Sequence, residues 1–145
     1  MRSRGRVEGG MLAPMDVAFD FRPTAAVPDY AALFRPHLQG ARQERLAVAY
    51  FDAAGMLLEL QLSGSGHQAV VAFPMRHIVQ SAMSRGAASV MLAHNHPSGC
   101  AEPSATDRQL TRRLAAALRP LDIRVLDHII FGDNGVTGFR ARGLL

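Results

Sequence analysis

The stretch that decides the fold is ASVMLAHNHPSGCAEPSATD, which runs from residue 88 to residue 107. Its first six residues are apolar apart from Ser89, and a short apolar run of this kind predicts a buried strand. A polar loop follows, from residue 94 to residue 103. Ser104 then predicts the start of a helix that runs to about residue 119, because a serine hydroxyl accepts a hydrogen bond from a free amide of the first turn.

Apolar runs and turn residues on both sides of this stretch predict the remaining elements. Gly55 supplies the turn of a hairpin, Pro74 opens a helix, and Pro36 ends a short one. We expect strands at 46–51, 56–62, 67–73, 88–93, 123–131 and 136–137, and helices at 29–36, 74–85 and 104–119. The longest helix is expected to pack through leucines 110, 114, 118 and 121. This order predicts an α/β fold, a mixed β-sheet with flanking helices.

Length and composition predict a single domain. The chain has 145 residues, of which 48% are hydrophobic, enough for one core and too few for two ordinary domains. Residues 1–27, rich in glycine and proline, are expected to form a flexible tail, and residues 28–145 the domain. No apolar run approaches the ~20 residues of a membrane span, and no signal peptide is recognisable. A single cysteine, Cys100, provides no internal disulfide, so we expect a cytoplasmic protein without a membrane partner.

The charge is basic and carried by arginine alone. The net charge is +4, and all sixteen basic residues are arginines, so no lysine is available as a catalytic amine. Four arginines are expected on the outer side of the longest helix, at positions 108, 112, 113 and 119. They form either an ordinary solvated face or a surface that attracts nucleic-acid phosphates weakly. No tryptophan is present to stack on bases.

Three residues of the opening stretch have the types and positions of metal ligands. His94 and His96 follow a predicted buried strand, and Asp107 lies in the first turn of the next helix. A catalytic zinc ion takes three nitrogen or oxygen ligands and leaves a fourth position for water. The positive end of the helix dipole would keep the aspartate ionised, as a ligand must be. The alternative is a surface His-x-His pair beside a helix cap.

The spacing His-x-His-x7-Ser-x2-Asp, from His94 to Asp107, resembles the metal motif of the JAMM (MPN-type) metalloproteases. The strings HNHPSG at 94–99, PS at 103–104 and DHIIFG at 127–132 resemble the RadC family within that group. The similarity extends from about residue 28 to residue 145. The resemblance implies a cytidine-deaminase-like (JAB/MPN) sandwich and one zinc ion per chain. It implies a zinc-dependent hydrolase, a metallopeptidase or isopeptidase, whose substrate is a protein or peptide.

The same resemblance implies roles for Glu44 and Ser104. Glu44 matches the family's glutamate, a general acid and base that takes a proton from the activated water. If strand 46–51 lies antiparallel to strand 88–93, Glu44 lies beside the ligand-bearing end. Otherwise Glu44 is a solvated charge between arginines. Ser104 corresponds to the serine that stabilises the oxyanion, and it is also simply a helix cap.

Asp127 and His128 are adjacent on a predicted strand, so their side chains point to opposite faces and cannot easily share one metal ion. We expect a structural role, or support of a ligand by one of them. Cys100 stands where the family often has an acidic residue, and we expect a bystander thiol. RadC proteins usually carry a helix-hairpin-helix region upstream, which residues 1–27 are too short to supply.

Two other functions compete with hydrolysis. One is a DNA-associated nucleic-acid-binding module with a vestigial or structural metal site, suggested by the family's DNA-repair label and by the arginines. The other is nucleobase deamination, which requires His-x-Glu and Pro-Cys-x-x-Cys. A chain with one cysteine cannot supply the second motif. Neither the substrate nor the oligomeric state follows from the sequence.

Overall fold

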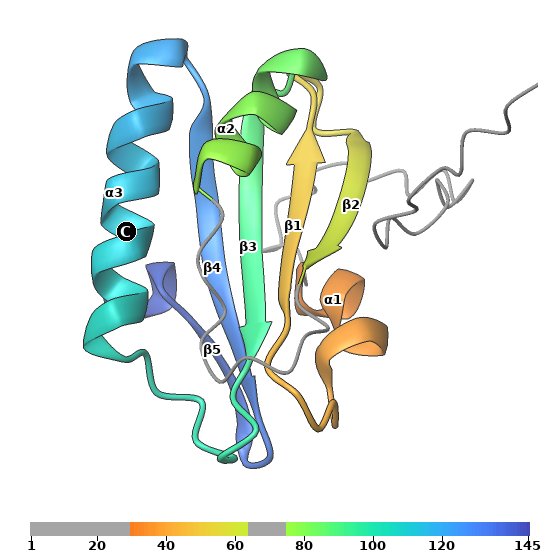
Figure 1. Ribbon diagram of the computed structural model, residues 1–145, viewed down its shortest axis with the longest axis vertical. Helices are drawn as coiled ribbons and strands as arrows, with labels where there is room; N and C mark the ends of the chain where they lie inside the picture. Colours follow the sequence, from red (N-terminus) through yellow and green to blue (C-terminus); the bar gives the residue numbers. More distant parts are fainter. Residues whose placement is uncertain (1–29, 64–74) are drawn as a thin grey trace, which may run out of the picture.

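A five-stranded mixed sheet forms the centre of the protein (Figure 1). The computed structural model describes residues 30–63 and 75–145. The strands are β1 (Leu46–Phe51), β2 (Leu57–Ser63), β3 (Ser89–Asn95), β4 (Arg124–Gly132) and β5 (Gly135–Gly138), and their order in the sheet is β2-β1-β3-β4-β5. Strands β3 and β4 are parallel, and the other neighbours are antiparallel.

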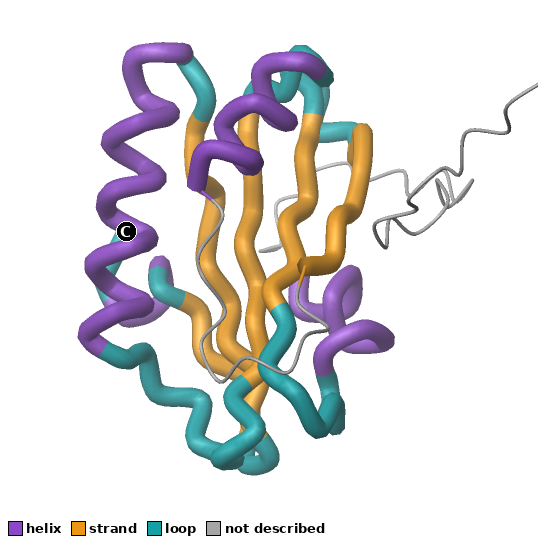
Figure 2. Tube along the Cα trace, in the orientation of Figure 1, coloured by secondary structure: helices purple, strands orange, loops and turns teal. Residues whose placement is uncertain are grey.

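Helices cover both faces of the sheet (Figure 2). The helices are α1 (Tyr30–Leu38), α2 (Met75–Ser84) and α3 (Ala105–Leu118), with short 3₁₀ helices at Arg119–Leu121 and Arg140–Arg142. Helices α2 and α3 pack on one face and α1 on the other. The predicted α/β class, a mixed sheet with flanking helices, is confirmed.

Strand β1 shows why the central strands are apolar at every position. All six of its residues are buried. Its side chains alternate between the two faces. Leu46, Val48 and Tyr50 pack in the core beneath α2 and α3, whereas Ala47, Ala49 and Phe51 pack beneath α1. A strand with helices on both faces has no solvent side, so the sequence shows a continuous apolar run instead of alternation.

The pairing of β1 with β3 determines which segments meet at the end of the sheet. The strands are antiparallel, as expected, and Leu46 lies opposite His94. The residues just before β1 therefore lie beside the carboxyl end of β3, at the lower end of the sheet in Figure 1. The amino end of α3 lies near the same place (Figure 1), and this is the region that holds the candidate site.

Two predicted boundaries and one predicted core residue were wrong. Strand β3 continues through His94 and Asn95, because both extend the parallel pairing with β4. Helix α1 continues through Pro36 to Leu38. Phe34 and Leu38 are fully buried one turn apart, and their packing outweighs the hydrogen bond that proline cannot donate. In the predicted leucine stripe, Leu121 is 39% exposed, because α3 ends at Leu118 and the chain turns away.

The inner side of α3 also differs from the predicted stripe at its first position. Leu110 is only partly buried, whereas Thr111 is completely buried. The predicted strand at 67–73, the helix start at Pro74, the cap at Asp29 and the tail at 1–27 lie outside the described residues.

Candidate metal centre

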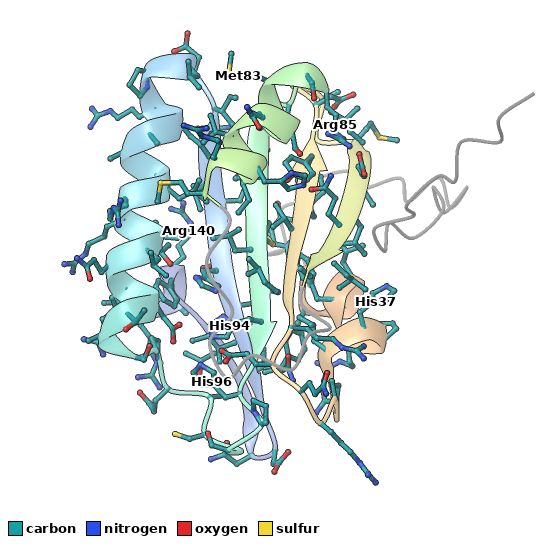
Figure 3. All side chains as sticks on the ribbon, viewed as in Figure 1. His37, Met83, Arg85, His94, His96 and Arg140 are labelled. Atoms are coloured by element: carbon teal, nitrogen blue, oxygen red, sulfur yellow. The ribbon has the colours of Figure 1, made fainter. Side chains whose placement is uncertain are left out.

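His94, His96 and Asp107 converge at the carboxyl end of β3, where the labelled histidines lie in Figure 3. The two Nε2 atoms are 2.7 Å apart. One carboxylate oxygen of Asp107 lies 3.4 Å from Nε2 of His94, and the other lies 3.3 Å from Nε2 of His96. The three side chains that the spacing singled out therefore direct their ligand atoms to one point.

This donor set fits a zinc ion. Nitrogen and oxygen ligands lie about 2.0–2.2 Å from zinc in tetrahedral sites, which places them about 3.3–3.5 Å from one another. The two distances to the Asp107 carboxylate fall in that range, and the imidazole nitrogens are somewhat closer together. Two imidazoles and one carboxylate also match the ligand types of catalytic zinc sites. Zinc ligation by these residues stays a prediction.

The first turn of α3 orients the carboxylate of Asp107. The amide of Asp107 donates to the Ser104 hydroxyl at 3.0 Å, and the amide of Ser104 donates to the Asp107 carboxylate at 2.8 Å. This capping box confirms Ser104 as the N-cap. Burial raises the pKa of Asp107, but the interactions of its carboxylate with His94 and Ser104 outweigh that effect and leave the pKa well below its usual value. The carboxylate is therefore ionised, as a metal ligand must be.

A backbone carbonyl determines which ring nitrogen of His96 carries the proton. Nδ1 of His96 lies 2.7 Å from the carbonyl oxygen of Cys100. A carbonyl can only accept, so Nδ1 donates, and Nε2 of a neutral ring keeps its lone pair for a metal ion. The main-chain amide of His96 also donates to the carbonyl of Phe131 at 2.8 Å. The loop after β3 thus holds this ring in the orientation that a ligand requires.

Glu44 lies just before β1, lines the same cleft as Asp107, and is half-buried. One of its carboxylate oxygens lies within 4.8 Å of ring nitrogens of both His94 and His96. By distance alone Glu44 could complete a ligand set with the two histidines. The carboxylate oxygens of Asp107 lie 3.3–3.4 Å from Nε2 of the two histidines, which is the separation expected of two ligands on one zinc ion. With Asp107 as the third ligand, the Glu44 carboxylate remains beside the ligand set.

A cleft of about 560 Å³ opens at this site. Glu44, His94, His96, Ser104 and Asp107 all line it. Its other walls mix apolar, polar and charged groups, including Leu46, Pro97, Leu110, Arg45 and Glu102. Cys100 is exposed and also contributes to the wall. The arrangement combines a candidate ligand set, a carboxylate beside it and a substrate-sized opening.

Sequence reasoning missed two residues of the site and only partly identified a third. His128, 2% exposed, places Nε2 2.6 Å from Nδ1 of His94, so it supports a ligand rather than binding metal itself. Asp127 points elsewhere and accepts from the amides of His128 and Arg140. Thr111 was missed, although a threonine one turn after Asp107 and in line with Leu114 and Leu118 was a usable signal. Asn95 was missed because nothing local shows what its side chain contacts.

Burial determines the charge of His128. Its pKa is well below the ordinary value, because desolvation disfavours the charged ring and the nearby His94 adds to the effect. The ring is thus neutral at physiological pH, and one of its nitrogens donates while the other accepts.

Comparisons with known proteins identify the family of the chain. The family of RadC-like JAB domains matches residues 25–144. A UPF0758 protein of Pseudoalteromonas translucida is 42% identical over 127 residues, which cover 86% of this chain and 54% of the relative. One from Aeromonas salmonicida is 44% identical over 114 residues, covering 78% and 51%, and one from Alcanivorax borkumensis is 41% identical over 117 residues, covering 80% and 52%.

The chain therefore spans about half the length of the curated relatives it matches. Within the described residues, no helix combines the length and apolar character that crossing a bilayer requires. The family match covers most of the chain, including every residue of the candidate site. The protein belongs to the RadC-like JAB domain family.

Proposed function

We propose that this protein is a zinc-dependent hydrolase of the JAMM type, which cleaves a peptide or isopeptide bond in a protein or peptide substrate. One observation carries the proposal: a carboxylate oxygen of Glu44 lies within 4.8 Å of ring nitrogens of both His94 and His96, the two histidines that also converge with Asp107. Zinc, when bound by His94, His96 and Asp107, supplies a Lewis acid that polarises the scissile carbonyl and lowers the pKa of a water molecule. The family match supports the hydrolase class.

Glu44 provides the proton transfers that amide hydrolysis needs. Its carboxylate accepts a proton from the attacking water and returns that proton to the leaving nitrogen. Its half-buried position in the cleft wall keeps it close to the ligand set while leaving it accessible to substrate. Proton transfer by a positioned carboxylate contributes typically ~10²–10⁴-fold to a rate.

Ser104 can cap the helix and assist the reaction at the same time. As the cap, its oxygen accepts one hydrogen bond from the amide of Asp107. A hydroxyl has one donor and two acceptor positions, so its proton remains available to the cleft. The Ser104 hydroxyl can then donate a hydrogen bond to the negative oxygen that develops on the substrate carbonyl.

The proposed roles of Asp107 and Glu44 predict opposite results when each carboxylate is replaced by the amide of the same shape. Protein purified without added metal should contain about one zinc ion per chain. Asp107→Asn should lose zinc, because a neutral amide replaces an anionic ligand. Glu44→Gln should keep zinc but lose ~10²–10⁴-fold in hydrolysis of a peptide library derived from a proteome, because an amide cannot accept a proton. Elemental analysis and mass-spectrometric cleavage profiling measure the two effects.

Wild-type protein with less than about a tenth of an equivalent of zinc, unrestored by added zinc, would refute the metal centre. Loss of zinc in Glu44→Gln and retention in Asp107→Asn would make Glu44 the ligand. Equal cleavage by wild type and Glu44→Gln would place the base elsewhere.

A further inference from the structure

A series of hydrogen-bonded side chains in the interior connects the backbone of Asp107 with the ring of His94. Oγ1 of Thr111 lies 2.6 Å from the backbone carbonyl of Asp107 and 2.7 Å from Nδ1 of His128. Nε2 of His128 lies 2.6 Å from Nδ1 of His94. We call Thr111, His128 and His94 the histidine relay. It joins α3, β4 and β3, and it begins at the same residue that supplies the carboxylate ligand.

The direction of every hydrogen bond in the histidine relay follows from its first acceptor. The carbonyl of Asp107 has no proton, so the single hydroxyl proton of Thr111 is donated to it. The oxygen of Thr111 must then accept from Nδ1 of His128. A neutral His128 ring with its proton on Nδ1 has a lone pair on Nε2, which accepts from Nδ1 of His94.

We infer that Thr111 and His128 are positioning residues that hold His94 in its metal-binding tautomer. With its proton on Nδ1, a neutral His94 presents the lone pair of Nε2 to the centre shared with His96 and Asp107. The inference rests on the proposed metal centre and adds to it the residues that determine ligand orientation. Without the hydroxyl of Thr111, the His128 ring has no reason to prefer Nδ1 over Nε2 as its donor, and His94 loses its fixed tautomer.

The two inner members of the histidine relay are almost completely buried, and one of them is held from one further side. Thr111 is completely buried and His128 is 2% exposed, so bulk water cannot take over these hydrogen bonds. The ring of the fully buried Phe139 stacks on that of His128, with centroids 4.7 Å apart and planes inclined by 22°. This packing fixes the plane of the His128 ring, while the hydrogen bonds fix its protons.

The relay also has a consequence for the pair of candidate ligand histidines. The relay leaves Nε2 of His94 as an acceptor, and the carbonyl of Cys100 leaves Nε2 of His96 as an acceptor. Two acceptors at 2.7 Å, with an ionised carboxylate beside them, repel unless a cation lies among them. The relay thus creates a group of lone pairs that only a proton or a metal ion can satisfy.

The test removes one hydroxyl and keeps the shape. Thr111→Val deletes Oγ1 with little change in volume, and Thr111→Ser keeps the hydroxyl and deletes the methyl group. Zinc affinity is measured by competition with a chromophoric chelator. We expect Thr111→Val to weaken zinc binding by about 10–100-fold and Thr111→Ser to stay close to wild type. Long-range ¹⁵N–¹H spectra of wild-type protein, zinc-loaded and zinc-free, should show His128 with its proton on Nδ1.

Zinc affinity in Thr111→Val equal to that in Thr111→Ser, or a wild-type His128 with its proton on Nε2, would overturn the inference. Melting temperatures are measured for both variants; if Thr111→Val does not fold, the wild-type spectrum alone decides. The proposed function fails separately, when wild-type protein binds no zinc. In that case the zinc-free spectrum of His128 still tests the direction of the hydrogen bonds.

Discussion

Asn95 lies between the two candidate ligand histidines in sequence, but its side chain binds the backbone of the segment before β1. Its Oδ1 accepts from the amide of Arg45 at 2.8 Å, and its Nδ2 donates to the carbonyls of Ala41 and Gln43 at 3.1 and 2.9 Å. These bonds fix the backbone on both sides of Glu44. Because strand neighbours alternate, the residue between two histidines reaches the segment that carries Glu44.

Asn95→Ala should therefore destabilise the protein and disturb Glu44 without removing a ligand. Asn95 is 3% exposed and its backbone partners are partly buried, so the variant leaves these groups without their partner, each at a cost of up to about 1–3 kcal/mol. The free energy of unfolding is measured by urea denaturation, and zinc content by elemental analysis. Asn134→Ala, at an exposed turn position, is the matched control. Equal unfolding free energies in the two variants would contradict the assigned role of Asn95.

At the scale of elements, the loop after β3 is held against the β4–β5 turn by close backbone packing. A Cβ atom on Gly132 would lie 2.5 Å from the carbonyl oxygen of Gly99 and 2.7 Å from the amide nitrogen of Ala101. The amide of Asp133 donates to the carbonyl of Gly99 at 2.9 Å. The same loop supplies the Cys100 carbonyl that orients His96. Glycine at position 132 thus allows the loop to approach β4.

Gly132→Ala is expected to weaken zinc binding at a distance from the ligands. The new methyl group must displace the backbone of residues 99–101, and His96 then loses its fixed hydrogen-bond partner. Gly86→Ala is the control: it lies at the opposite end of β3, with φ at +64° and open space around a Cβ. The control should lose about 1 kcal/mol of stability from backbone strain alone. Isothermal titration with zinc should show weaker binding by Gly132→Ala than by Gly86→Ala. Equal zinc affinities in the two variants would refute the packing argument.

At the scale of the whole molecule, four of the sixteen arginines lie on the outer side of α3 or at its end. Arg108, Arg112 and Arg113 are exposed, and Arg119 follows at the end of the helix. Within residues 30–63 and 75–145, none of the four forms an ion pair at 4.0 Å or less. The inner side of the same helix carries Leu114 and Leu118, both fully buried. Amphipathicity alone accounts for this distribution.

We expect this surface to bind DNA only weakly. Non-specific electrostatic binding has a Kd of about 10⁻⁴–10⁻⁶ M at physiological salt and falls steeply as salt rises. Changing all four arginines to glutamine should lower the salt dependence without affecting zinc content. Fluorescence anisotropy with labelled duplex and single-stranded DNA measures the affinity of the wild-type protein and of the variant at several salt concentrations. Sub-micromolar binding that survives high salt and disappears in the variant would instead make the DNA-associated module the leading function.

The sequence alone determined the parts of this protein that depend on neighbouring residues. The apolar run before His94 predicted β3, and Ser104 predicted the start of α3, because strand burial and helix capping act within a few residues. His94, His96 and Asp107 lie within one short stretch, so a strand end and a helix start suffice to bring them together. Glu44 was identified by resemblance, and its position beside His94 follows from the pairing of β1 with β3.

Only the tertiary structure decided what surrounds the ligands. Thr111 contacts a histidine 17 residues away, His94 contacts one 34 residues away, and Asn95 reaches a backbone amide 50 residues away. These contacts depend on strand order, on register and on the packing of α3 against β4. A one-residue change of register would turn His128 to the other face of the sheet, since strand neighbours point in opposite directions. Local patterns carry no record of such distances, so the sequence predicts the ligands and the fold predicts what orients them.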